Sequence, residues 1–215
     1  MDGTLISTGG AGTRSWRWAF EELHGIPADI GESSEAGMTD PVVGRSTFRN
    51  VLHRDPTDAE MRSLLAAYLK RLPAEVQASD GYRVLPGAED VLRSLNGTGR
   101  VTGIVTGALE EAARIKLSRG DLNRFLPFGG FGSDSADRVE LTRRGIERGA
   151  ALIRRELPPG RVHVLGDTPR DMDAAVAVGA VPVGITTGKY RADALKLAGA
   201  KVVIPTLEAY PALLH

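Results

Sequence analysis

The alternation of short apolar runs with helix-like segments after residue 80 constrains the fold more than any other feature of this sequence. The apolar runs are typical of strands and occur at "RVTGIVTG", "FLPFGGFGS", "RVHVLGD", "AVPVGITTG" and "KVVIP". Helical spacing of apolar residues is found before, between and after them, over 86–95, 109–118 and 139–157, in "RDMDAAVAVGA" and "RADALKLAGA", and from residue 207. Strands that alternate with helices predict an α/β fold, with a Rossmann-like, doubly wound parallel sheet and right-handed crossovers.

The stretch before residue 80 has a different pattern. Apolar residues recur at helical spacing in "SWRWAFEEL" and in "TDAEMRSLLAAYLKRL", which opens with a capping box formed by Thr57 and Glu60. We find no convincing strand there. We therefore predict an all-helical cap domain over residues 13–79, inserted into a core domain made of residues 1–12 and 80–215.

Charge and cysteine content exclude several classes of function. The 27 Lys and Arg residues balance the 27 Asp and Glu residues, so we expect neither a nucleic acid nor a membrane as partner. The sequence has no Cys, which excludes disulfides, thiolate metal sites and a cysteine nucleophile, and favours a reducing, cytoplasmic location. No apolar run approaches the roughly 18 residues that a membrane span needs. The oligomeric state stays open.

Polar residues follow three of the expected strands, at Asp2, at Thr106 and at Asp167. Taken singly, each has an ordinary explanation as an exposed terminal residue, a helix cap or a turn residue. In open parallel sheets, however, ligands bind beyond the carboxyl ends of the strands. Their common position at that edge of the sheet favours a shared site.

Three motifs at these positions resemble those of the haloacid dehalogenase superfamily, and in particular its phosphatases with a helical cap, such as phosphoglycolate phosphatases. "MDGTL" is similar to the second half of the first motif, DxDGT, and "GIVTG" is similar to the second motif. "VLGDTPRDMDAA" resembles the fourth motif, GDTxxDxxA, which is the most specific of the three. The resemblance spans essentially the whole chain. It implies a phosphatase that hydrolyses a small phosphorylated metabolite through an aspartyl-phosphate intermediate.

The resemblance also implies a Mg²⁺ cofactor and a role for each motif residue. Asp2 would protonate the leaving group and then activate water, and its backbone carbonyl would bind the metal. Asp167 would be a direct metal ligand, and Asp171 a further ligand or a partner of one. Hard oxygen ligands suit Mg²⁺, which offsets phosphate charge during attack. Thr106 would hold the phosphoryl oxygens, together with the substrate-binding residues Gly3, Thr4 and Gly107.

The third motif of the family is normally a Lys that stabilises the phosphoryl charge. Arg138 in "SADRVELTRRG" occupies the matching position, and Arg keeps the charge and can bind in a bidentate manner. The alternative is an ordinary solvated helix face, because this region is rich in Arg. Lys116 and Lys189 are weaker candidates.

Arg45 in "VVGRS", within the expected cap, could contact the non-phosphate end of the substrate, or be an ordinary surface residue.

The nucleophile of the family lies two positions before Asp2, and therefore ahead of Met1. Its strand is ordinarily an interior one, and its loss would leave buried ladder partners unpaired. We expect that the chain is truncated before its nucleophile, so that the phosphatase begins earlier. The alternative is a catalytically inactive protein that binds a phosphorylated metabolite or a protein partner. A nucleotide-binding fold of another family is not favoured, because "STGGAGTR" matches neither GxGxxG nor GxxxxGK[ST].

Overall fold

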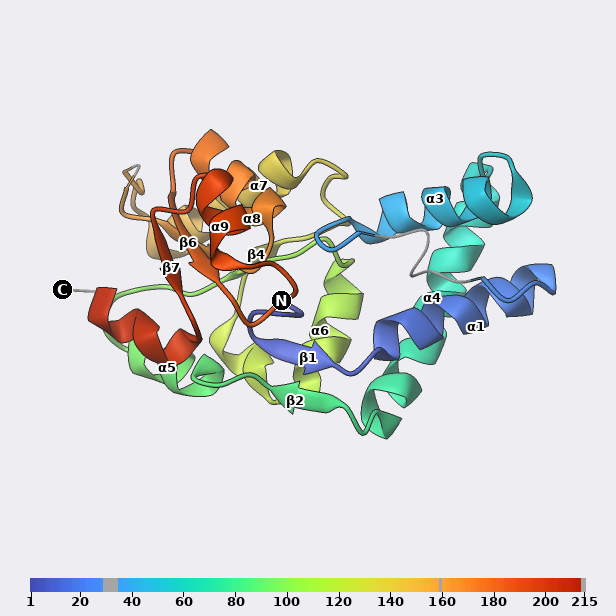
Figure 1. Ribbon diagram of the computed structural model, residues 1–215, viewed down its shortest axis with the longest axis horizontal. Helices are drawn as coiled ribbons and strands as arrows, with labels where there is room; N and C mark the ends of the chain where they lie inside the picture. Colours follow the sequence, from blue (N-terminus) through green and yellow to red (C-terminus); the bar gives the residue numbers. More distant parts are fainter. Residues whose placement is uncertain (29–34, 159, 214–215) are drawn as a thin grey trace.

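The computed structural model describes residues 1–28, 35–158 and 160–213. A group made of α1 (Ala11–His24), α3 (Asp40–Leu52) and α4 (Asp58–Ala78) projects to one side of the molecule (Figure 1). The strands are β1 (Ile6–Thr8), β2 (Tyr82–Val84), β3 (Ile104–Val105), β4 (Gly129–Gly130), β5 (His163–Gly166), β6 (Val181–Ile185) and β7 (Val202–Ile204). The other helices are α5 (Ala88–Leu95), α6 (Glu110–Ser118), α7 (Arg138–Ile153), α8 (Pro169–Ala177) and α9 (Ala192–Leu197).

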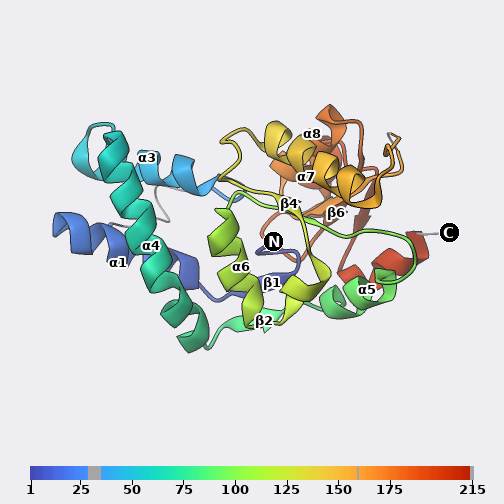
Figure 2. The ribbon, with the colours of Figure 1, turned by 180° about the vertical axis from the view of Figure 1, so that it is seen from behind.

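Parallel strands form the centre of the larger part of the molecule. β3 pairs with β4, and β6 pairs on its two edges with β5 and β7, all in parallel. Helix α7 packs against β3 and β4, α8 packs against β5 and β6, and the two helices pack against each other, as Figure 2 shows from behind. The predicted α/β class with parallel strands is confirmed. Within the described residues, β3 and β5 each keep one edge that pairs with no named strand.

Two short strands form an antiparallel pair that the sequence did not predict. β1 precedes α1 and β2 follows α4, and Ile6 lies opposite Val84 while Thr8 lies opposite Tyr82. The two passages of the chain between the helical group and the parallel sheet therefore run side by side. Pairing them satisfies the backbone groups of both connections at once.

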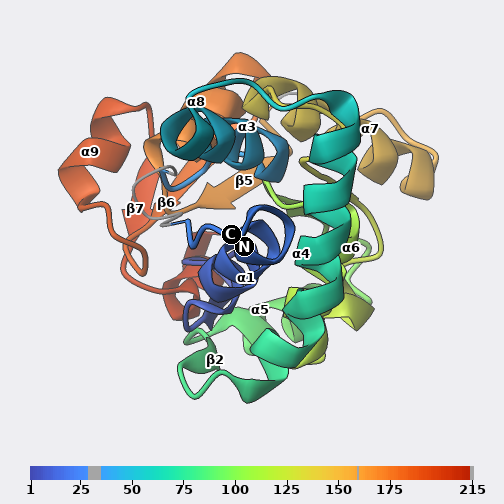
Figure 3. The same cartoon turned by 90° about the vertical axis from the view of Figure 1, so that its right-hand side faces the viewer.

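The helical group is held together by aromatic side chains. Trp16 on α1 stacks on Tyr68 of α4, with 4.4 Å between ring centroids, and Phe20 meets the edge of Phe48 on α3 at 5.3 Å. Figure 3 shows the helices α1, α3 and α4 grouped together. The capping box at the start of α4 is confirmed, and α1 begins at residue 11, two residues before the predicted boundary. The limits of the two domains stay a prediction.

Two helical predictions for the second half of the chain were wrong in detail. The long helix expected over 139–157 is α7, which ends at Ile153 because Arg154 adopts a left-handed conformation with φ of 51°. Asp137 caps its start by accepting the Val139 N–H at 2.8 Å. The last helix is a 3₁₀ helix over Leu207–Leu213, and another 3₁₀ helix covers Leu122–Phe125. Across the described residues we find no helix with the length and hydrophobicity that crossing a bilayer requires.

Candidate active site

The N-terminal segment forms a tight turn in front of β1. The carbonyl of Met1 accepts the N–H groups of Leu5 at 2.9 Å and of Thr4 and Ile6 at 3.2 Å. Gly3 adopts a φ of 77°, which side-chain-bearing residues rarely adopt, and donates its own N–H to Ile6 at 2.9 Å. The turn brings the chain end to the carboxyl ends of the parallel strands.

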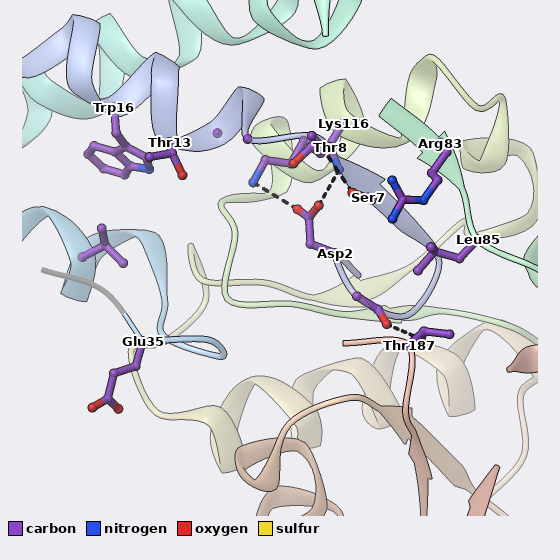
Figure 4. Close-up of a pocket in the computed structure, with 15 residues that line it drawn as sticks. Asp2, Ser7, Thr8, Thr13, Trp16, Glu35, Arg83, Leu85, Lys116 and Thr187 are labelled. Carbon is purple, nitrogen blue, oxygen red and sulfur yellow. Dashed lines mark hydrogen bonds and ion pairs between the residues drawn. The ribbon is translucent and has the colours of Figure 1, made fainter. Parts of the chain in front are cut away.

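Asp2 projects from this turn into a cavity, and both of its carboxylate oxygens have partners. Oδ1 accepts the Thr8 N–H at 2.9 Å, and Oδ2 lies 3.8 Å from Nζ of Lys116 on α6 (Figure 4). The side chain of Asp2 remains 42% exposed. It is therefore oriented by the protein and still accessible to a ligand.

Asp167 follows β5 directly and is buried beneath the N-terminal turn. Its Oδ1 accepts a hydrogen bond from the Thr4 hydroxyl at 2.8 Å. A Cβ added at Gly3 or Gly188 would lie 2.2 or 2.0 Å from Oδ2, so both glycines allow the backbone to approach the carboxylate. Burial and the charge of Asp171 raise the pKa of Asp167, although the N-terminal ammonium and the Thr4 hydroxyl oppose the shift.

Asp171 lies in the first turn of α8, where it forms a capping box with Thr168. Its Oδ2 accepts the Thr168 N–H at 3.1 Å and the Thr168 hydroxyl at 2.8 Å, while its Oδ1 accepts a hydrogen bond from Arg138 of α7. Burial would raise the pKa of Asp171, but Arg138, the N-terminal ammonium and Thr168 hold it below its ordinary value. The pKa values of Asp167 and Asp171 are therefore shifted in opposite directions.

The loop after β3 carries Thr106 and Gly107 and is covered by the linker into α3. The Thr106 hydroxyl oxygen is buried and accepts the Ala108 N–H at 3.2 Å, which leaves its hydrogen free to donate. The Gly107 carbonyl accepts the Asp40 N–H at 2.7 Å. A Cβ at Gly107 would lie 2.2 Å from the carbonyl oxygen of Met38, so only glycine lets this linker pack so closely.

A cavity of about 470 Å³ lies between the helical group and the larger part of the molecule. Its lining comes from the N-terminal turn, the glycine-rich start of α1, β2 and α6 (Figure 4). Two cations, Arg83 and Lys116, and two carboxylates, Asp2 and Glu35, contribute to it. The charges of this lining balance, and the lining suits a small polar ligand.

The structure brings some of the predicted site residues together and separates others. Asp2 and Gly3 line the cavity, Thr4 joins Asp167, and Arg138 joins Asp171. Thr106 and Gly107 lie in the loop beneath the linker to α3 and do not line the cavity. Arg45 is exposed on α3 and Lys189 is exposed after β6, and neither lines it.

Three charged residues near Asp2 are not apparent from the motifs of the sequence. Lys116 is only a weak candidate for the third motif, and Arg83 and Asp40 belong to no motif. Lys116 did leave a signal, because it shares the buried face of α6 with Ala112 and Ala113, where a Lys needs a partner. Arg83 and Asp40 carry no comparable signal.

The residues after β5 fit a magnesium site only in part. Among the described residues, no three His, Cys, Asp or Glu side chains are grouped closely enough to hold a metal by themselves. Mg²⁺ usually takes only one or two protein carboxylates and keeps several waters. Asp167 fits such a ligand, because it is buried and forms no ion pair with any side chain in the described part of the chain. Asp171 fits less well, because both of its oxygens already accept hydrogen bonds.

Comparisons with known proteins agree with the resemblance of the motifs. A family model of haloacid dehalogenase-like hydrolases matches residues 1–179. The probable phosphatase IndB of Dickeya dadantii (strain 3937) is 24% identical over 223 aligned residues, which cover 100% of this chain and 91% of IndB.

Solved structures share the fold at low sequence identity. A hydrolase from Pseudomonas syringae matches with a TM-score of 0.71 and 23% identity, over 99% of this chain and 94% of its own. A predicted phosphoglycolate phosphatase from Haemophilus somnus 129pt matches with a TM-score of 0.75 and 14% identity, over 98% and 93%. Because this family model matches most of its length, the chain belongs to the haloacid dehalogenase-like hydrolases.

Proposed function

We propose that this protein is a Mg²⁺-dependent phosphatase that hydrolyses a small phosphorylated metabolite through an aspartyl-phosphate intermediate. The observation that carries the proposal is the buried hydrogen bond of 2.8 Å from Thr4 to Asp167, which joins the first motif to the fourth across 163 positions. A site assembled from such distant segments is hard to explain as a set of helix caps. The name of the relative IndB, a probable phosphatase, supports the same chemistry.

We place the attacking carboxylate two positions before Asp2, in a strand ahead of Met1. Two features support this placement. In the described part of the chain, β3 pairs only with β4 and β5 only with β6, so each has an edge available for a further strand. The N-terminal ammonium also lies near enough to Asp167 and Asp171 to lower the pKa of both. A chain continued backwards from Met1 would therefore start beside the two acidic residues.

The remaining roles follow from the geometry. Asp2 would donate a proton to the leaving oxygen and later take one from the attacking water. Asp167 and the Asp2 carbonyl would hold Mg²⁺, which supplies positive charge against the phosphoryl oxygens. Arg138 would hold Asp171, and the free hydroxyl hydrogen of Thr106 would donate to a phosphoryl oxygen.

The proposal is tested by extending the chain before Met1 with an apolar strand that ends in Asp. For the extended chain we expect higher stability and hydrolysis of p-nitrophenyl phosphate with Mg²⁺, and for the 215-residue chain we expect negligible activity. The matched control ends in Asn, which fills the same space but cannot form the aspartyl-phosphate, and should recover stability alone. If the Asp-ending chain is stabilised yet hydrolyses none of a broad panel of phosphate esters, a binding role without turnover replaces the phosphatase.

A further inference from the structure

Lys116 is a buried cation to which the proposed function assigns no role. It lies on the inner face of α6 with a side chain only 10% exposed, and Nζ is 3.8 Å from Oδ2 of Asp2. The other lysines, Lys70, Lys189, Lys196 and Lys201, are all exposed. Burying one ammonium group is costly unless nearby groups compensate for its lost hydration. The partners of Lys116 therefore show what its charge is placed to do.

The compensating groups come from both sides of the cavity. Burial lowers the pKa of Lys116, but neighbouring Tyr68, Asp2 and Asp40 raise it by more, so the side chain stays a cation at neutral pH. Asp2 belongs to the N-terminal turn, Asp40 begins α3, and Tyr68 lies on α4. Lys116 therefore interacts both with Asp2, the proposed general acid, and with side chains of α3 and α4 in the helical group.

Asp40 is itself fixed to the loop that precedes α6. Its N–H donates to the Gly107 carbonyl at 2.7 Å, and its Oδ2 accepts the Leu109 N–H at 2.9 Å. The hydroxyl of Tyr68 is buried and faces Lys116, and its ring is stacked on Trp16. Backbone contacts therefore anchor Asp40, and ring stacking anchors Tyr68. Their position sets the electrostatic environment of the ammonium group.

We propose that Lys116 is a positioning residue, which holds the Asp2 carboxylate toward the cavity and ties its orientation to the helical group through Asp40. The inference rests on the proposed function, in which Asp2 exchanges a proton with the leaving group. The Thr8 N–H fixes one oxygen of Asp2, and Lys116 constrains the other. Exposed ion pairs are usually weak because two mobile side chains must be ordered, but Lys116 is already ordered by burial. Without it, a partly exposed carboxylate would be held at one oxygen only.

The experiment is a double-mutant cycle in the Asp-ending extended chain. Lys116→Met keeps the aliphatic volume and removes the charge, and we expect kcat to fall by about 10- to 100-fold through misorientation of the acid, with KM changed less than about threefold. In an Asp2→Asn background the same substitution should change kcat by less than about twofold, because there is no acid left to position. Lys116→Arg should keep more activity than Lys116→Met, and Lys70→Met on the exposed face of α4 is the control. If Lys116→Met does not fold, Lys116→Gln takes its place with the same expectation.

Three results would overturn the inference. An equal loss of kcat in both backgrounds would mean that Lys116 does not act through Asp2. A rise in KM alone would make it a substrate-binding residue. If the extended chain turns over phosphate esters and Lys116→Met behaves like Lys70→Met, only the positioning role fails. If that chain hydrolyses no ester at all, the proposed function fails, and the positioning role fails with it.

Discussion

The loop after β5 and the N-terminal turn both carry acidic motif residues, but they are held in place in different ways. In the loop, Thr168 and Asp171 cap each other within four residues, and Arg138 is the partner from outside. In the turn, Thr4 depends on distant Asp167, and the Gly3 carbonyl accepts from distant Thr187. The loop forms its capping side-chain contacts locally, whereas the turn adds to its local backbone hydrogen bonds contacts that form only when distant segments meet in the folded protein.

The sharpest test of this comparison replaces the two carboxylates of the loop in turn. In an active extended chain, we expect Asp167→Asn to lower kcat/KM by on the order of 10³ and to weaken Mg²⁺ binding, because a direct ligand is lost. Asp171→Asn should cost about 10- to 100-fold, as expected for a group that orients the site. Activity assays and calorimetric Mg²⁺ titration measure both. Unchanged Mg²⁺ affinity in Asp167→Asn would remove that residue from the metal site.

Gly3→Ala should break the N-terminal turn in the 215-residue chain. The new Cβ would lie 2.2 Å from Oδ2 of Asp167, and the backbone of the new alanine would have to keep a φ near 77°. We expect a loss of about 2–4 kcal/mol in the free energy of unfolding, measured with urea. Gly97→Ala is the control, because Gly97 has a φ of 81° with no atom within 4 Å of its Cβ position, so it costs only about 1–2 kcal/mol of backbone strain. Equal losses would show that the approach of Gly3 to Asp167 is not tight.

Thr4→Val and Thr168→Val compare a distant hydrogen bond with a local one. Each should cost about 1–2 kcal/mol at pH 7, because a hydroxyl that serves a buried carboxylate is lost. The pH dependence should differ. The pKa of Asp167 is raised and rises further without Thr4, so Asp167 becomes protonated as the pH falls and the cost of Thr4→Val shrinks. The pKa of Asp171 is lowered, so the cost of Thr168→Val should persist at pH 5. Urea unfolding at both pH values is the measurement, and parallel profiles would contradict the assignment.

The same contrast explains what could be predicted from the sequence. Spacing within a few residues identified the capping box at Thr57 and the acidic residues after β5, because those features are local. The antiparallel pairing of β1 with β2 was missed, since it depends on where the chain re-enters the sheet. Lys116 was underrated for a similar reason: its partners Asp2 and Asp40 are distant in sequence and meet it only in the folded protein.

Thr187→Val gives the smallest expected effect and tests whether the N-terminal turn is held as a unit. The Thr187 hydroxyl donates to the Gly3 carbonyl at 2.5 Å, in a partly buried position. Its loss should cost about 0.5–1.5 kcal/mol in the free energy of unfolding. Because Gly3 and Thr4 are adjacent, the double variant with Thr4→Val should deviate from additivity by at least about 0.5 kcal/mol. Strict additivity in urea unfolding would mean that the two contacts act independently, and that the turn is defined mainly by its own hydrogen bonds to Met1.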